Sequence, residues 1–221
     1  MQNDNRGQTT QMPQNWTAVA LSRDVPPQVV IPSVVDGREL AVWRSQSGRV
    51  AAWDDRCPHR GMRLSHGFVR GEALSCIYHG WSYNEAGLCQ RIPAHPDLVP
   101  PDAIRVPVQV AAESGGVIWV ALQETGQAPP SLGEFVPMRS VTVEAPATTV
   151  AALTGVEIDT AGALSVDLAE TPCVLLVQNL PADRVALHVL VAAGTSAAAQ
   201  AGVSRALEDL RRRAESERQP A

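Results

Sequence analysis

The first half of the chain consists of short apolar stretches separated by turn-forming residues. Two β-prone arms, residues 38–44 and 49–53, flank the sequence Ser-Gln-Ser-Gly, which is typical of a β-hairpin. Further short strands with turn signals between them continue to the apolar run VIWVAL at residues 117–122. This pattern predicts a mainly β domain in the first half of the chain.

The second half predicts a small antiparallel sheet. It follows a segment rich in Gly and Pro, so we assign residues 126–140 as a linker. Leu164, Val166 and Leu168 then alternate with polar residues, which is typical of a strand. Further strands are expected in VTVEAPATTVAAL and GVEID, within residues 141–159, and in the apolar runs 173–180 and 185–193.

The chain is expected to end in an amphipathic α-helix from about Ser196 to Glu215. Apolar residues recur there at helical spacing, while Arg and Glu occupy the other face. The apolar positions are Val203, Ala206, Leu207, Leu210 and Ala214. This helix can cover one face of the predicted sheet.

The two long apolar runs lack alternation, so both faces of the sheet need to be covered. Large exposed apolar patches are uncommon on monomers, and we expect another subunit to cover the face that the helix leaves open. The sequence therefore predicts a homo- or hetero-oligomer. On this view, deleting residues 141–221 leaves a soluble N-terminal domain.

Composition places the chain among globular proteins with a buried core. Its 221 residues, 45% hydrophobic and 19% charged, suffice for one large domain or two small ones. The net charge of −5 gives no reason to expect nucleic acid or a membrane surface as a partner. Residues 1–14 are polar, are expected to form a disordered tail, and lack the apolar region of a secretion signal. We therefore predict a cytoplasmic protein.

Two short motifs carry the candidate chemistry. Cys57 and His59 form a Cys-X-His motif, and after sixteen intervening residues Cys76 and His79 form a Cys-X-X-His motif. This arrangement predicts a Rieske [2Fe–2S] cluster, in which one iron takes two thiolates and the other takes two imidazoles. The alternative is a tetrahedral zinc site, but zinc fingers usually place two Cys on one arm and two His on the other.

The other cysteines and the arginines near the motifs have simpler interpretations. Cys89 and Cys173 lie in unrelated sequence settings and are expected to be free thiols, with Cys173 buried. Arginines cluster around the motifs and are expected to be solvated or ion-paired, although a basic rim could steer an acidic reductase. They are Arg56, Arg60, Arg63, Arg70 and Arg91.

The segment from about Trp16 to Leu122 resembles the Rieske domain of Rieske non-haem iron oxygenases, of the aromatic-ring hydroxylase and O-demethylase type. The resemblance is carried by VAAWDDRCPHRGMRLSHG, CIYHGWSYNEAGLCQRIPAHP and GGVIWVAL. It implies an antiparallel Rieske domain, assigned to residues 15–125, a Rieske [2Fe–2S] cofactor, and an electron-donating reductase as partner.

Some positions distinguish this segment from the respiratory Rieske proteins. The loop cysteines that form a disulfide there correspond to Met62 and Tyr78 here. The serine that hydrogen-bonds the cluster there corresponds to Trp81, while Tyr83 is retained. Fewer hydrogen bonds to the sulfurs favour a lower, oxygenase-like potential.

A complete oxygenase of this family also carries a mononuclear iron held by two histidines and a carboxylate. The histidines outside the two motifs are His66, His95 and His188, and no two of them are close in sequence. The resemblance therefore implies a chain without the mononuclear iron motif, and we assign no catalytic residue. Residues 141–221 are interpreted as a remnant of the oxygenase catalytic domain.

Three functions remain open at this point. The first is an electron-transfer or accessory component that passes electrons to an oxygenase subunit carrying the mononuclear iron. The second is a non-catalytic structural partner of an oxygenase. The third is a monooxygenase or dioxygenase subunit with a diverged iron site.

Overall fold

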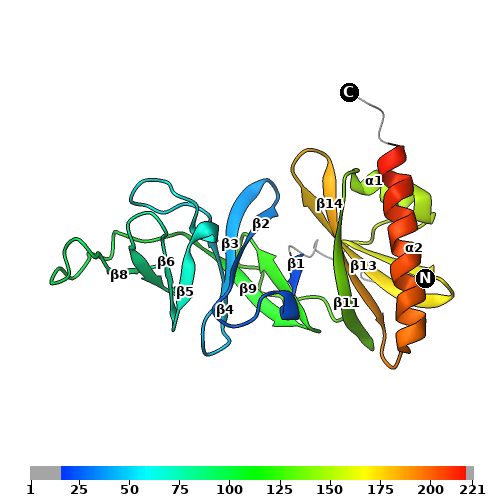
Figure 1. Cartoon of the computed structure of the whole chain (residues 1–221), viewed down its shortest axis with the longest axis horizontal. Coiled ribbons are helices and arrows are strands. Elements are labelled where there is room, and N and C mark those ends of the chain that lie inside the picture. The colour runs from blue at the N-terminus through cyan, green and yellow to red at the C-terminus, as the bar shows by residue number, and fades with distance from the viewer. Residues whose placement is uncertain (1–15, 218–221) are drawn as a thin grey trace, which may run out of the picture.

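The described part of the chain forms three antiparallel sheets that follow one another along the long axis of the molecule (Figure 1). The structure is a computed structural model and describes residues 16–217. The tail predicted at residues 1–14 lies outside the described residues. Within the described residues, no helix is both long and apolar enough to cross a membrane.

The central sheet has six strands in the order β1-β10-β9-β4-β3-β2. Its strands are β1 (Thr17–Leu21), β2 (Val30–Val35), β3 (Arg38–Arg44), β4 (Val50–Asp54), β9 (Val108–Ser114) and β10 (Val117–Ala121), and a 3-10 turn, η1 (Ser22–Asp24), follows β1. Strands β3 and β4 pair antiparallel around the predicted turn, where the N–H of Ser45 donates to the carbonyl of Arg49 at 2.9 Å. The predicted hairpin is confirmed.

A small four-stranded sheet, β5-β6-β7-β8, lies at one end of the molecule (Figure 1). It consists of β5 (Phe68–Arg70), β6 (Ala73–Ser75), β7 (Ser82–Asn84) and β8 (Cys89–Arg91), with the 3-10 turn η2 (Leu64–His66) before it. Trp53 links this sheet to the central one, because its ring makes edge contacts with Trp43 at 4.9 Å and with Tyr83 at 6.3 Å. These buried aromatic rings form the floor beneath the two cysteine motifs.

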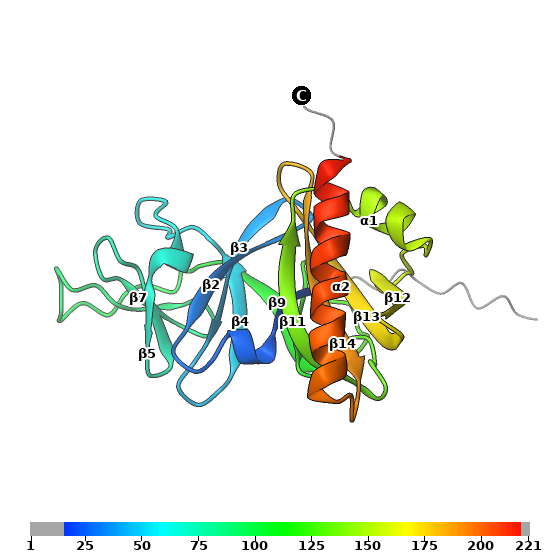
Figure 2. The same cartoon turned by 45° about the vertical axis from the view of Figure 1, so that its right-hand side comes forward.

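The third sheet has the order β11-β14-β13-β12 and is packed against the helix α2 (Figure 2). Its elements are β11 (Phe135–Val143), β12 (Ala163–Leu168), β13 (Thr171–Leu180), β14 (Arg184–Ala192), α1 (Ala147–Thr154) and α2 (Ala197–Ser216). The side chain of Ser196 caps α2 by accepting a hydrogen bond from the N–H of Ala199. The antiparallel sheet and the terminal helix are confirmed, and β11 begins inside the segment 126–140.

The strands predicted within residues 141–159 are wrong beyond β11. Helix α1 occupies residues 147–154, and GVEID at residues 155–159 lies outside any strand. The β-branched run Thr148-Thr149-Val150 favours a strand by local propensity. Burial of Val150 in the core between sheet and helices overrides this preference, and Gly155 ends the helix at a φ of 69°.

Both faces of the third sheet are covered within this chain. On one face Val203 and Leu207 of α2 pack into a core with Leu175 and Val189. On the other face the sheet meets the central sheet. The residues buried at that junction include Trp16, Leu21, Val117, Trp119, Leu176 and Leu190. The lack of alternation in β13 and β14 therefore requires no second subunit.

A buried polar network also joins the third sheet to the central sheet. The side chain of Gln178 donates to Ser33 Oγ and to the carbonyl of Val34, both at 2.9 Å. Its Oε1 lies 3.3 Å from Nε2 of His188, and Nδ1 of His188 lies 2.9 Å from the hydroxyl of Ser140. These contacts indicate that the imidazole of His188 is neutral and that its Nε2–H donates to Gln178. His188 is thus a buried histidine whose two ring nitrogens both have hydrogen-bond partners.

The stability of the fold is expected to fall as the pH drops, because His188 in this network takes up a proton. Burial lowers the pKa of His188 from 6.5 to about 4. The unfolded chain therefore binds a proton at higher pH than the folded chain does, so the contribution is complete above about pH 6.5 and declines towards pH 4. The decline amounts to about 3 kcal/mol at most. Urea titrations of the wild type and of His188→Gln between pH 4 and 8 measure it, and parallel curves for the two proteins would contradict the assignment.

Candidate iron–sulfur centre

The first ligand motif forms a tight loop between β4 and η2. The N–H of Cys57 donates to the carbonyl of Met62 at 2.8 Å, and the N–H of Gly61 donates back to the carbonyl of Cys57 at 2.8 Å. Gly61 has a φ of 70°, a conformation that glycine adopts without strain. The loop therefore closes on itself between Cys57 and Met62.

The second motif, between β6 and β7, repeats this geometry. The N–H of Cys76 donates to the carbonyl of Trp81 at 2.9 Å, and the N–H of Gly80 donates to the carbonyl of Cys76 at 3.0 Å. Gly80 has a φ of 67°. Two loops with the same hydrogen-bond pattern thus face each other, and each presents one thiol and one imidazole.

The two thiols lie on the buried side of the site. Cys57 and Cys76 are 3% and 2% exposed, and their side chains interact directly. Burial raises the pKa of Cys76, while the N–H groups of Tyr78 and His79 point at its sulfur and work in the opposite direction. The hydroxyl of Tyr83 lies 3.1 Å from Sγ of Cys57. Burial raises the pKa of Tyr83, so this hydroxyl keeps its proton and can donate to the sulfur.

The two imidazoles lie on the solvent side. His59 is half-buried and His79 is exposed, with their ring centroids 4.6 Å apart. Trp81 reaches across from the second loop and stacks on His59 at 4.3 Å, with the ring planes only 3° apart. Tyr78 packs on His79 at 3.8 Å. Burial lowers the pKa of His59, with a smaller contribution from His79, which favours the neutral imidazole that binds metal.

This arrangement of donors fits a Rieske [2Fe–2S] cluster. Such a cluster takes two thiolates on one iron and two imidazoles on the other. The structure provides one pair of thiols in contact and one pair of imidazoles in contact. Within the described residues, no group of three or more His, Cys, Asp or Glu side chains is placed to hold a single metal ion. A single zinc would need all four donors around one point, so the paired arrangement favours the diiron cluster.

Two acidic residues that sequence reasoning missed hold the first loop in place. Glu39 of β3 accepts hydrogen bonds from Arg56, at 2.6 Å, and from Arg63. Asp55 is buried and accepts from both the N–H and the hydroxyl of Ser65, each at 2.6 Å. Glu39 lies far from the motif in sequence, and no local pattern marks it. Asp55, two residues before Cys57, could have been considered as an anchor of the loop.

The remaining candidate residues lie away from the site or outside any cluster of donors. His66 and His95 are exposed, and His188 belongs to the third sheet. Cys89 and Cys173 are buried free thiols on β8 and β13.

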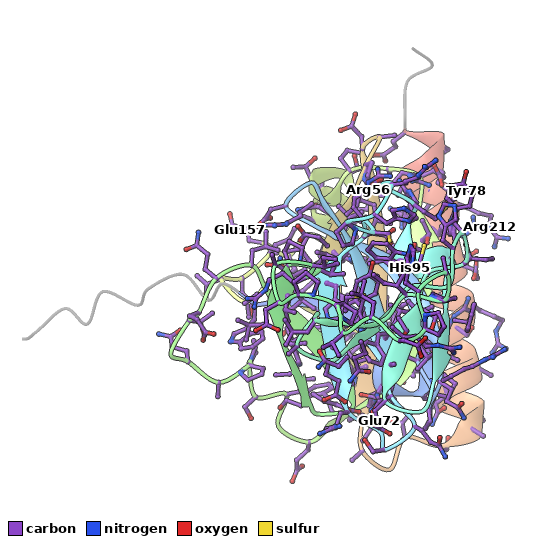
Figure 3. The ribbon with its side chains drawn as sticks, turned by 90° about the vertical axis from the view of Figure 1, so that its left-hand side faces the viewer. Arg56, Glu72, Tyr78, His95, Glu157 and Arg212 are labelled. Atoms are coloured by element: carbon purple, nitrogen blue, oxygen red, sulfur yellow. The ribbon has the colours of Figure 1, made fainter. Side chains whose placement is uncertain are left out.

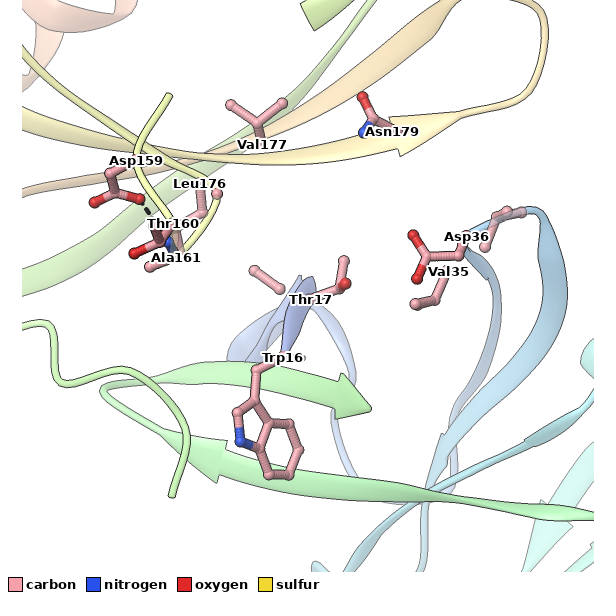
Figure 4. Close-up of a pocket in the computed structure, with 13 residues that line it drawn as sticks. Trp16, Thr17, Val35, Asp36, Asp159, Thr160, Ala161, Leu176, Val177 and Asn179 are labelled. Atoms are coloured by element: carbon pink, nitrogen blue, oxygen red, sulfur yellow. Dashed lines mark hydrogen bonds between the residues drawn. The ribbon is translucent and has the colours of Figure 1, made fainter. Parts of the chain in front are cut away.

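A cavity of about 250 Å³ at the junction of the central and third sheets is lined by Thr17, Asp36, Asp159 and Asn179, among others (Figure 4). None of the four predicted ligands lines it.

Comparison with known proteins identifies the N-terminal part of the chain. Residues 15–109 match the family model of the Rieske [2Fe-2S] domain. Oxidoreductase NdmD of Pseudomonas putida is 44% identical over 115 residues, covering 52% of this chain and 19% of that protein. Pheophorbide a oxygenase of Oryza sativa is 38% identical over 120 residues, covering 51% of this chain and 23% of that protein. The chain thus covers about a fifth of the length of these curated relatives.

Solved structures extend the likeness of fold to nearly the whole chain. The structure of NdmA from Pseudomonas putida CBB5 superimposes with a TM-score of 0.72 at 18% identity, covering 93% of this chain and 81% of that chain. Dicamba monooxygenase bound to dicamba gives a TM-score of 0.70 at 16% identity, covering 91% and 86%. The third sheet and α2 therefore share the fold of these proteins as well. Residues 15–109 are a Rieske [2Fe–2S] domain, similar in sequence to segments of oxidoreductase NdmD and of pheophorbide a oxygenase.

Proposed function

We propose that this chain is an electron-transfer component of a Rieske oxygenase system, with the cluster held by Cys57, His59, Cys76 and His79. The observation that supports this most directly is the pairing of buried thiols opposite solvent-facing imidazoles. The bound cluster takes up and releases one electron at a time. A reducing compartment such as the cytoplasm fits the free cysteines of the chain.

The residues of the site divide into two tasks. Cys57, Cys76 and Tyr83 form a dry inner wall, in which hydrogen bonds to sulfur tune the reduction potential. His59 and His79 form the outer wall, and His79 presents the more exposed imidazole edge. Electrons are proposed to enter and leave by this edge.

The electron acceptor is proposed to be an iron on another polypeptide. The ligand loops lie at the opposite end of the long axis from the third sheet and α2 (Figure 1). Residues 16–217 contain no cluster of two histidines and a carboxylate of the kind that holds a mononuclear iron. We propose that the third sheet is a remnant of an oxygenase catalytic domain, retained because it covers the apolar face of β1 and β10.

Single-turnover experiments with the cluster-loaded chain test this function. A reductase with NADH is expected to reduce the cluster without forming product. Product is expected only when an oxygenase with an intact mononuclear iron site and its substrate are added. Turnover by the chain alone would instead assign it a diverged iron site of its own, and a cluster that no donor reduces would assign it a structural role.

A further inference from the structure

The most exposed large apolar side chains of the described residues gather at the end of the molecule that carries the ligand loops. Ile77 and Tyr78, directly before His79, are 57% and 54% exposed. Leu98 and Val99, in the segment after β8, are 51% and 87% exposed. The next such residue, Val108, is less exposed, at 45%. We call these four residues the cluster-end surface.

The two segments of the cluster-end surface are linked to the ligand loops by direct packing. A Cβ atom at Gly80 would lie only 3.0 Å from the ring of Pro93, so the segment after β8 lies against the second ligand loop. Tyr78 packs on the imidazole of His79. Figure 3, which views the molecule from this end, shows Tyr78 and His95 on the same face. The apolar surface therefore adjoins the edge by which electrons are proposed to pass.

The charge on the ligand loops beside this surface is positive. Glu39 pairs with Arg56 and Arg63, and this pairing leaves Arg60, next to His59, exposed without an acidic partner among the described residues. Arg91, opposite Ser82 in the sheet, is likewise exposed and has no carboxylate partner in the described part of the chain. The ligand loops, residues 57–62 and 76–81, contain no acidic residue. The segment that carries Leu98 and Val99 also holds two exposed acids, Asp97 beside Leu98 and Asp102 three residues beyond Val99.

We propose that the cluster-end surface is the docking surface for an acidic electron-donor protein. Apolar side chains at the centre of a small interface contribute most of the contact energy, while unpaired charges at the rim steer association. A donor with an apolar centre and a carboxylate opposite Arg60 would contact Tyr78 and approach the edge of His79. In the encounter the donor is oxidised by one electron and this chain is reduced by one electron. The proposal rests on the electron-transfer function proposed above.

Stopped-flow reduction of the cluster-loaded full chain by reduced flavodoxin, an acidic one-electron donor, tests the proposal. Val99→Ser is expected to lower the second-order rate constant several-fold, whereas its matched control Val136→Ser, at an apolar position 42% exposed on β11, leaves it unchanged. Arg60→Glu is expected to lower the rate constant about tenfold at low salt and to flatten its salt dependence. The control Arg205→Glu, exposed on α2, changes neither, and Asp97→Asn raises the rate constant.

The remaining outcomes contradict either the docking surface or the electron-transfer function. Equal rate constants for Val99→Ser and Val136→Ser, or an unaltered salt dependence in Arg60→Glu, would overturn the docking surface. A full-length dimer that Val99→Ser converts to a monomer would assign the surface to a second copy and overturn it too. Dithionite reduction and the Rieske electron paramagnetic resonance signal should be unchanged in every variant. If dithionite fails to reduce the wild type, the electron-transfer function itself fails, independently of the docking surface.

Discussion

Replacing Cys76 by serine is expected to yield a folded chain without its [2Fe–2S] cluster. The thiolate of Cys76 has no substitute in the loop, because His79 is the other metal-binding side chain of residues 77–81 and its imidazole is proposed to bind the other iron. His79→Ala is expected to have the same effect. Iron content should fall from about two per chain to near zero, with loss of the visible absorbance and of the Rieske electron paramagnetic resonance signal. Metal analysis and absorbance spectra of the purified variants measure this.

Two matched control variants distinguish the loss of a cluster ligand from general damage to the fold. Cys173→Ser removes a buried thiol in the third sheet, and His66→Ala removes an exposed histidine close to the first loop. Both are expected to keep the full iron content. A colourless wild type that carries one zinc per chain after expression in iron-rich medium would refute the cluster assignment, and so would a Cys76→Ser variant that retains the Rieske signal.

The four proposed ligands could be singled out in the sequence because each half of the candidate site is a local motif. Cys57 with His59, and Cys76 with His79, lie on self-closing loops whose shape depends on Gly61 and Gly80. Strands β3 and β4, joined by a short turn, and the amphipathic helix α2 were predictable for the same reason. In each case, the residues that determine the element are neighbours in sequence.

The features that were missed depend on contacts between distant residues. Glu39 orients the first loop from a neighbouring strand, and α1 forms against the strand preference of its own residues because Val150 is buried beneath it. The cover over β13 and β14 was assigned to another subunit, because the pattern of a strand shows that its faces are buried but not what buries them. Trp119 and Leu190 lie in one core only after the chain has folded back on itself.

This shared core changes the result expected from deleting residues 141–221. The deletion would uncover Trp16, Val117 and Trp119, which are all less than 10% exposed in the full chain. An apolar face of this kind on an antiparallel sheet is a site for aggregation. The truncated chain is therefore expected to be largely insoluble or to bind the dye ANS strongly, in contrast to the soluble domain that the sequence indicated. The soluble yield and dye fluorescence of the two chains measure this.

A substitution that leaves the chain intact tests the same coupling. Leu190 is fully buried between the sheets, so Leu190→Ala is expected to lower the free energy of unfolding by roughly 2–5 kcal/mol. Because both sheets contribute to this core, the variant should lose its cluster absorbance and its helical circular dichroism at the same, lowered urea concentration. Val136→Ala, at an exposed position of the third sheet, should change the free energy of unfolding by no more than about 0.5 kcal/mol, whether absorbance or circular dichroism is followed. A cluster absorbance whose midpoint is unchanged in Leu190→Ala would show that the Rieske domain is stable independently of the third sheet.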